Sequence, residues 1–341
     1  IRGGRHTFAV SGEAACPRCG GVGFVGEHVC PTCAGVGRID EQRTVEVTIP
    51  KDVKDGATLR LRGLGEPGDD GGEAGDLGAM FAEIVTDTQK RLNETMRTLG
   101  AGAFALAYQP ICDLKTGKVS HYEALARFDN PEGTGATVKF IEAMGVVDSF
   151  DLAVANKILS VLEERPDAHI AFNISGATID SPSSFGLLAG ILAKRRKLAP
   201  RALIEITETA TIQDLAAAGM AVAALRAMGY RVGLDDFGAG AASINYLHAF
   251  PVDFVKFDGA MIAKIGQSKR DDALLAGMAK LCGELGVITI AEWIENEAMA
   301  KQALALGFDD GQGKFLGAPL TEIPRAQTPV GKRKGVTTSW G

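Results

Sequence analysis

The chain has 341 residues, 46% of them hydrophobic and 23% charged, which is an ordinary globular composition and enough length for two domains. Its formal net charge of −6 argues against a general binder of nucleic acid polymers, which needs a basic surface. A small phosphate-containing substrate stays compatible with this charge, because bound cations can supply a positive field locally. No uncharged apolar run reaches about 18 residues, so the sequence predicts no membrane span. The chain begins at Ile1, without an initiator methionine or an apolar signal segment, and we expect a fragment.

Four of the six cysteines lie close together, in two copies of the pattern CxxCxGxG with ten residues between the CxxC pairs. Each pair can place two thiolates on one turn, and two such turns complete a tetrahedral set of four sulfurs around Zn²⁺. A redox CxxC usually occurs once, beside a βαβ pattern that this region lacks. We therefore predict one structural zinc ion held by Cys16, Cys19, Cys30 and Cys33.

Cys112 and Cys282 stand apart from this group, each in an apolar context. A disulfide framework would distribute its cysteines in pairs along the chain, which this arrangement does not do. We therefore expect a reducing compartment, the cytoplasm.

The region up to about residue 85 is rich in glycine and lacks helical periodicity. Residues 43–50 (RTVEVTIP) and 57–62 (ATLRLR) alternate as strands do, and residues 63–78 have the composition of a loop. Residues 87–99 are polar and favour a helix. These features predict a small β-rich zinc-binding module over residues 1–85 and a linker helix within residues 86–103.

After residue 103, short apolar runs alternate with segments of helical pattern, of which 151–164, 212–228 and 271–285 are examples. Eight such runs are present: 105–113, 121–128, 169–175, 202–207, 232–237, 254–257, 287–294 and a weaker one at 308–316. Eight strands separated mostly by helices indicate an α/β fold whose sheet closes into a barrel.

The first two apolar runs are separated by residues 114–118 only, which is too short for a crossover helix. They should form a hairpin, so that one strand runs antiparallel to the others. The expected fold is a TIM-like (β/α)8 barrel with one antiparallel strand over residues 104–322, followed by a flexible tail over residues 323–341.

Polar residues recur at the carboxyl ends of the predicted strands, where a barrel of this kind gathers its chemistry. They are Glu123, Asn173, Glu205, Asp235, Asp236, Lys256, Glu292, Glu295 and Gln312. Each residue alone is more often a solvated charge or part of a turn, and a lysine can extend out of a barrel wall. Together they would repel one another without cations, and their oxygen atoms suit Mg²⁺ or Mn²⁺ rather than zinc. Two such cations can clamp the attacking and leaving oxygens of a phosphodiester.

Glu123-Ala124-Leu125 lies within YQPICDLKTGKVSHYEALARF, and FNIS, IEITE, DDFGAG, PVDFVKFD, AEWIE and QGKFLGAPL follow in order. From about residue 104 to 320 this resembles the EAL-domain cyclic di-GMP phosphodiesterases. The resemblance implies a hydrolase in cyclic di-GMP signalling that opens this dinucleotide to linear pGpG with two Mg²⁺ or Mn²⁺ ions. A homodimer through the barrel is a candidate assembly.

The resemblance also implies a role for each matching residue. One cation is held by Glu123, Asn173, Glu205 and Asp235, while Asp235 and Asp236 hold the second. Lys256 and Glu292 position and deprotonate the attacking water, and Glu295 and Gln312 support waters on the metal ions. The substrate contacts are Gln109, Leu125 and Arg127, of which Arg127 has a planar fork suited to a phosphate or a guanine edge.

Some positions depart from the family pattern. The loop after the two aspartates lacks an aromatic residue and a hydroxyl at Ala241 and Ala242, and Glu208 normally anchors that loop. Trp293 stands at a usual glycine and Lys314 at a usual aromatic residue. These changes bear on rate, metal affinity, dimerisation and the pocket rim.

The N-terminal region resembles the cysteine-rich and adjoining β region of DnaJ co-chaperones, continuing through VTIPKDVKDGATLRLRGLGEPG and EAGDL. Two cysteine repeats stand where the family has four, and no His-Pro-Asp tripeptide occurs. Three functions follow from the two resemblances, in order of preference: an active phosphodiesterase, a catalytically weak cyclic di-GMP receptor, and chaperone-type client binding through the zinc module.

Overall fold

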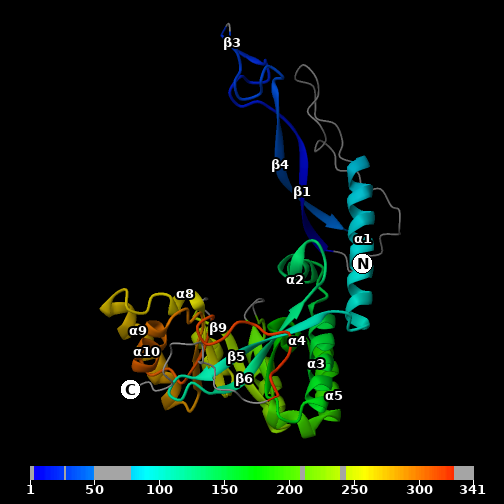
Figure 1. Cartoon of the computed structure of the whole chain (residues 1–341). Coiled ribbons are helices and arrows are strands. Elements are labelled where there is room, and N and C mark those ends of the chain that lie inside the picture. Colours follow the sequence, from blue (N-terminus) through cyan, green and yellow to red (C-terminus); the bar gives the residue numbers. More distant parts are fainter. Residues whose placement is uncertain (1–3, 27, 50–77, 208–211, 239–242, 326–341) are drawn as a thin grey trace. The chain divides into compact units, whose positions relative to one another are not determined.

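The computed structural model describes residues 4–26, 28–49, 78–207, 212–238 and 243–325 (Figure 1). The chain divides into two compact units, residues 1–95 and 96–341. The predicted strand at 57–62 and nearly all of the predicted loop at 63–78 lie outside the described residues, as does the tail from residue 326.

The N-terminal unit is built on two long antiparallel strands. They are β1 (Gly4–Ala15) and β4 (Arg38–Ile49), which pair from Gly4 opposite Ile49 to Ala15 opposite Arg38. The cysteine segment connects them and carries the short hairpin of β2 (Phe24–Val25) and β3 (His28–Val29). The strand predicted at 43–50 is the second half of β4. The expected linker helix is part of α1 (Gly78–Gly100).

The second unit contains a closed barrel of eight strands, as the sequence predicts. In chain order the strands are β5 (Ala105–Asp113), β6 (Val119–Arg127), β7 (Ile170–Ser175), β8 (Ala202–Thr207), β9 (Arg231–Phe237), β10 (Phe254–Phe257), β11 (Ile288–Ala291) and β12 (Asp310–Gln312). The order around the barrel is β10-β11-β12-β5-β6-β7-β8-β9. Strand β5 is antiparallel to both of its neighbours, and the other pairs are parallel.

The hairpin between β5 and β6 is closed by local hydrogen bonds. The Asp113 carboxylate accepts bonds from the backbone N–H of Thr116, at 2.6 Å, and from its hydroxyl, at 2.8 Å. Gly117 has φ +68°, a backbone conformation that glycine adopts without steric cost. These contacts complete the turn, and the predicted antiparallel strand is confirmed.

Helices surround the strands; Figure 1 shows α3, α5, α9 and α10 on the outside of the sheet. They are α2 (Gly133–Ala143), α3 (Val147–Glu164), α4 (Gly176–Asp180), α5 (Pro182–Lys194), the 3₁₀ helix η2 (Arg196–Arg201), α6 (Leu215–Ala227), α7 (Ser243–Ala249), α8 (Gly259–Ile262), α9 (Lys269–Glu284) and α10 (Glu297–Ala305). The segments predicted as helical at 151–164, 212–228 and 271–285 correspond to α3, α6 and α9.

A layer of apolar side chains lies inside the barrel below the polar strand ends. It is formed by Ile111, Ala171, Leu203, Phe254 and Ile290, each at most 2% exposed. A Cβ atom on the neighbouring Gly233 would overlap the ring of Phe254, so only glycine leaves room for it there. This layer closes the barrel beneath the polar side chains and shields them from bulk water on that side.

Among the helices that the structure describes, none combines the length and the apolar character needed to cross a membrane.

A candidate metal and phosphodiester site

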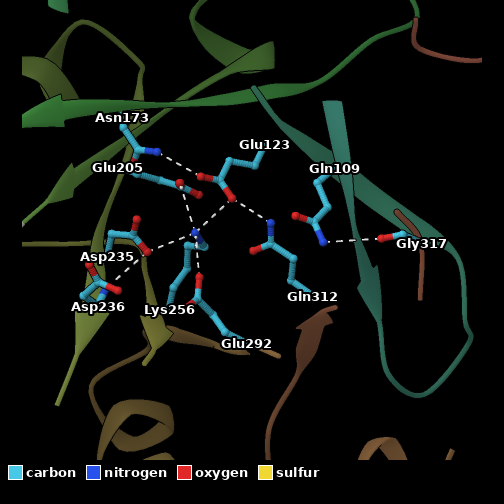
Figure 2. A network of polar contacts seen from close by, with 10 residues as sticks. All are labelled: Gln109, Glu123, Asn173, Glu205, Asp235, Asp236, Lys256, Glu292, Gln312 and Gly317. Carbon is cyan, nitrogen blue, oxygen red and sulfur yellow. Dashed lines mark hydrogen bonds and ion pairs between the residues drawn. The ribbon is translucent and has the colours of Figure 1, made fainter. Parts of the chain in front are cut away.

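The strand-end residues predicted from the sequence converge inside the mouth of the barrel (Figure 2). They come from β6, β7, β8, β9, β10 and β12 and from the residue after β11; they are Glu123, Asn173, Glu205, Asp235, Lys256, Gln312 and Glu292. Glu205 is fully buried, and Glu123, Lys256 and Gln312 are at most 5% exposed. A parallel barrel brings these positions together because all of its parallel strands end at the same rim.

Lys256 lies at the centre of the group (Figure 2). Its Nζ is 2.9 Å from Asp235 Oδ1 and 2.9 Å from Glu292 Oε1. It is also 3.2 Å from Glu123 Oε2 and 3.4 Å from Glu205 Oε2. Burial alone would lower the pKa of this lysine, but the four carboxylates outweigh burial and raise that pKa well above its ordinary value. The side chain is therefore an ammonium ion, and it does not extend out of the barrel wall.

Two amide side chains fix the orientation of Glu123. Asn173 Nδ2 donates to Glu123 Oε1 at 2.9 Å, and Gln312 Nε2 donates to Glu123 Oε2 at 2.6 Å. Burial would raise the pKa of Glu123, but the charge of Lys256 and these two hydrogen bonds bring it below its ordinary value. Glu123 is therefore a carboxylate although it is almost completely buried.

The other acids of the group are harder to ionise. Burial raises the pKa of Glu205 well above its ordinary value, and the charges of neighbouring acids act in the same direction. Burial likewise raises the pKa of Asp235, that of Asp236 to about 6 and that of Glu292 to about 7. Burial is the largest cause of each shift, and the charges of the neighbouring acids add to it, because a single ammonium ion faces several carboxylates.

Several buried oxygen atoms of this group have no hydrogen-bond partner among the described residues. They are Asn173 Oδ1, both carboxylate oxygens of Glu205, and Gln312 Oε1; the only close cation at Glu205 is Lys256, at 3.4 Å. An orphaned buried oxygen costs about 1–3 kcal/mol. A cation would satisfy these atoms, and uncharged or anionic oxygens are the ligands that Mg²⁺ and Mn²⁺ prefer.

The acids form two potential metal sites that share one residue. Glu123, Glu205 and Asp235 offer ligand oxygens within 4.8 Å of one another, and so do Asp235, Asp236 and Glu292. The shared residue is Asp235, as the family resemblance implies. The second set includes Glu292, for which that resemblance implies a role toward the attacking water. The residues present therefore fit a pair of divalent cations.

Asp236 reaches this site because its backbone departs from the strand conformation. Consecutive side chains of a regular strand point to opposite faces. Asp236 has φ +54°, and its backbone N–H donates to Asp235 Oδ1 at 3.1 Å. The left-handed conformation turns both carboxylates toward one point, at a steric cost that is usual at functional sites.

A cavity of about 270 Å³ opens beside Asn173 at the ends of β6 and β7. Its walls include Leu125 and Arg127, which the sequence predicts as substrate contacts, and also Phe150 and Asp151 of α3, which it did not. Asp151 is 3% exposed, and burial raises its pKa to about 7, against the effect of its hydrogen bonds. One sign of this role is present in the sequence: Asp151 is an acid in the segment predicted as helical at 151–164, on the face that this helix buries.

Two predicted residues lie apart from the acidic group. Gln109 Nε2 donates to the backbone oxygen of Gly317 at 3.4 Å, and Gln109 pairs with Glu123 in the β5–β6 register. Glu295 is exposed, 4.0 Å from Lys314. The positions that depart from the family loop, Ala241 and Ala242, lie outside the described residues, together with Glu208.

The four clustered cysteines form a separate potential metal site in the N-terminal unit. Their sulfurs all lie within 4.8 Å of one another, with Cys16 and Cys30 Sγ 3.8 Å apart and Cys19 and Cys33 Sγ 3.7 Å apart. Burial would raise the pKa of Cys30, but backbone N–H groups of its own turn lower it to about 6. Four sulfurs in this arrangement match the donor set of a structural zinc site.

The glycines of the two repeats explain why the turns are so tight. The backbone N–H groups of Gly23 and Gly37 donate to Cys19 and Cys33 Sγ, each at 3.2 Å. Both glycines have positive φ, and a Cβ atom on either would overlap the backbone of the opposite repeat. The glycines of the CxxCxGxG pattern are thus required for two reasons. Their N–H groups orient the sulfurs, and the absence of a Cβ atom allows the two repeats to approach each other closely.

Comparisons with known proteins agree with the two-part organisation. A model described as EAL domain matches residues 92–319, and a model described as DnaJ C terminal domain matches residues 1–93.

The chain is 30% identical over 227 residues to the cyclic di-GMP phosphodiesterase PdeB of Shewanella oneidensis, covering 63% of this chain and 26% of PdeB. It is 27% identical over 243 residues to the cyclic di-GMP phosphodiesterase PdeA of Borreliella burgdorferi, covering 68% of this chain and 36% of PdeA. The alignments span between 26% and 40% of the length of the first few relatives.

The solved structure of the FimX EAL domain of Xanthomonas citri in complex with c-diGMP is similar in fold, with a TM-score of 0.62 and 23% sequence identity. The match covers 72% of this chain and 100% of that one.

The cysteine site should determine whether the N-terminal unit folds. Replacing Cys16 and Cys19 together by serine removes two of four ligands, and the cysteines make up most of the buried cluster among the side chains described at residues 16–39. We expect loss of bound zinc, measured by atomic absorption, and loss of protection of amides in residues 16–37, measured by hydrogen exchange. Replacing Cys112 and Cys282 by serine should leave the zinc content unchanged. Equal protection in the Cys16/Cys19 variant would contradict the prediction.

Proposed function

The chain belongs to the EAL-domain family, and on this premise we propose that its barrel hydrolyses cyclic di-GMP to linear pGpG with two Mg²⁺ or Mn²⁺ ions. One observation carries the proposal: two sets of acids, all buried or half-buried except Asp236, share Asp235, beside orphaned oxygens of Asn173 and Glu205. Relatives of about 30% identity are named cyclic di-GMP phosphodiesterases, which supports the substrate.

The ligand roles follow from the two sets of acids. Glu123, Asn173, Glu205 and Asp235 would hold one cation, and Asp235 with Asp236 the other, with Glu292 close enough to contribute. Bound there, the pair of cations supplies positive charge to the attacking and leaving oxygens and lowers the pKa of water. Five carboxylates and one ammonium ion carry a formal charge of −4, which two divalent cations neutralise.

Lys256 and Glu292 are the groups best placed to handle the attacking water. They contact each other at 2.9 Å, so each fixes the orientation of the other. The pKa of Glu292, raised by burial to about 7, allows it to accept a proton near neutral pH. Lys256 holds its ammonium group where negative charge develops during attack.

The cavity beside Asn173 suits a base with a polar edge. Phe150 and Leu125 offer apolar walls, Arg127 offers paired N–H donors, and Asp151 offers an acceptor. A guanine has an acceptor edge for an arginine and N–H donors for a carboxylate. This chemistry favours one guanine of cyclic di-GMP as the occupant.

The zinc module favours a second, independent candidate function, the binding of apolar client segments. Apolar side chains are exposed around its cysteine turns: Val22 and Val36 at 73%, Val29 at 55%, Phe24 at 50% and Val25 at 43%. Exposed apolar groups gathered on so small a unit are typical of an interaction surface. Client binding would add to the activity of the barrel and does not compete with it.

The metal assignment predicts the outcome of replacing its shared ligand. Asp235→Ala should lower hydrolysis of cyclic di-GMP by at least about 10³-fold, because both cation sites lose an oxygen. Burial raises the pKa of Asp235 in the folded state, while its 2.9 Å contact with Lys256 favours its ionised form, so these two effects on stability oppose each other and the melting temperature is measured alongside activity. Glu297→Ala, which removes an exposed acid, is the control.

Chromatographic separation of the products checks this prediction and also the proposal itself. Wild-type protein with Mg²⁺ or Mn²⁺ should convert cyclic di-GMP to pGpG. Normal turnover by Asp235→Ala would contradict the metal assignment, and wild-type binding without turnover would make the barrel a receptor.

The position of Lys256 predicts a change in kcat rather than in KM. Lys256→Ala should lower kcat by about 10²–10⁴-fold, the usual effect of losing a positioned proton-transfer or charge-stabilising group. KM should change much less, because the lysine contacts acids of the protein rather than the substrate in its ground state. Steady-state kinetics at saturating Mg²⁺ measures both constants. An increase in KM with kcat intact would instead make Lys256 a phosphate clamp; Lys264→Ala, an exposed lysine, is the control.

The client-binding function predicts that the exposed valines matter. Full-length protein should suppress the aggregation of a chemically denatured apolar protein, measured by light scattering, and Val22→Ser with Val36→Ser should reduce this suppression several-fold. Zinc content should not change, because both side chains are 73% exposed and neither residue is one of the four cysteine ligands. Leu274→Ser, which changes an exposed leucine of the barrel unit, is the control. If this variant and the valine variant suppress aggregation equally well, the client-binding function is contradicted.

A further inference from the structure

Trp293 is a large apolar side chain that remains 60% exposed at the mouth of the barrel. It directly follows Glu292, whose carboxylate contacts Lys256, so the two Cα atoms are about 3.8 Å apart. The indole therefore lies at the rim of the acidic group. Among the described residues, Trp293 and Phe24 are the two aromatic side chains in the group of exposed large hydrophobic residues, and an exposed aromatic face can pack against a planar ligand.

The backbone holds Trp293 in a conformation that is costly for it. Its φ is +52°, a left-handed value that glycine adopts freely and a tryptophan does not. Hydrogen bonds fix both neighbours: Glu292 N–H donates to Phe257 O at 3.4 Å, and Ile294 N–H donates to Gln312 O at 2.9 Å. The side chain thus projects from a rigid segment, and its presence is not needed to maintain that segment.

One face of the indole is supported by the protein. A Cβ atom on Gly259, at the start of α8, would overlap the five- and six-membered rings of Trp293. The ring therefore lies flat against the backbone of Gly259, while most of its remaining surface faces solvent. A ring supported on one side and open on the other is a stacking platform.

The shape of the proposed substrate requires a second base site. Cyclic di-GMP has two guanines, and the cavity of about 270 Å³ at β6 and β7 has room for one of them. Around the barrel, β10 and β11 lie on the other side of the shared acids from β6 and β7. With the scissile phosphate at those acids, the guanine that does not enter the cavity reaches toward the rim that carries Trp293.

We propose that Trp293 is a specificity-determining residue that stacks on the second guanine of the substrate, with Gly259 supporting the opposite face of its ring. This rests on the proposed function, because it takes cyclic di-GMP as the substrate. Stacking on an aromatic side chain contributes about 1–3 kcal/mol per base. The left-handed backbone at Trp293 is then retained for binding, at a cost to stability.

Kinetics of four single variants and one double variant test the assignment. Trp293→Gly should raise KM for cyclic di-GMP about 5- to 150-fold, equivalent to about 1–3 kcal/mol, with kcat changed less than KM. Its melting temperature should be at least that of the wild type, because glycine suits the backbone. Trp293→Phe should recover most of the affinity. Gly259→Ala should weaken binding in the wild type by displacing the ring, and should have little further effect in Trp293→Gly. Leu274→Ala, equally apolar and 57% exposed, is the control.

Fluorescence gives a readout that does not depend on turnover. Trp340 is the only other tryptophan in the sequence, so in a Trp340→Phe background the emission reports Trp293 alone. Titration with cyclic di-GMP in the presence of Ca²⁺, which we expect to bind without supporting reaction, should quench this emission. GMP alone should quench it only at much higher concentration.

The outcomes separate the two proposals. A raised KM in Trp293→Gly with recovery in Trp293→Phe, together with quenching, supports the stacking role. An unchanged KM, or unchanged emission in a protein that hydrolyses cyclic di-GMP, overturns the stacking role and leaves the proposed function standing. A wild-type protein that neither binds nor hydrolyses cyclic di-GMP overturns both.

Discussion

The ammonium group of Lys256, held among four carboxylates in the barrel, is the contact on which the site depends. It is 1% exposed and compensates one of the negative charges that β6, β8, β9 and the end of β11 bring together. Within the described residues, the oxygens of Glu205 and one oxygen each of Asn173 and Gln312 have no hydrogen-bond partner, so Lys256 does not satisfy the whole group. The contacts of Lys256 allow these acids to be buried without a metal ion, while the remaining unpaired oxygens favour the binding of cations. The proposed metal-dependent hydrolysis requires both properties.

The barrel supplies the rigidity that this charge group needs. Phe254 fills the space beneath the acids only because Gly233 has no side chain, so the apolar layer and the polar layer are determined together. Three non-glycine residues in the described ranges have positive φ, and two of them, Asp236 and Trp293, lie at the mouth of the barrel. Backbone strain at these two positions, in an otherwise regular fold, agrees with the binding roles proposed for them.

The sequence was most informative where one short-range pattern determines the result. Apolar runs located the eight barrel strands, and the polar residue ending each run located most of the acidic group, because strand ends of a barrel share one rim. The sequence could not show that Asp151 joins the cavity from α3, or that β1 pairs with β4 along twelve residues, because both depend on contacts distant in the chain. The sequence shows that tryptophan occupies a position where the family usually has glycine. It could not predict the left-handed backbone at Trp293 or the surface against which the indole ring packs.

The two potential metal sites differ in what the fold would lose without them. The barrel has an apolar layer of five strands and a large surrounding core, so its acids can exchange hard cations while the structure persists. In the described part of the N-terminal unit, the buried cluster is made of Cys16, Cys30 and Cys33 with Cys19 and Ile39 against it. Within that cysteine segment the four sulfurs occupy the place of a core, and a metal ion bound to them would hold its two turns together. Soft thiolates bind zinc tightly and suit that permanent role, whereas carboxylates that bind magnesium more weakly suit a site that must also admit and release a phosphodiester.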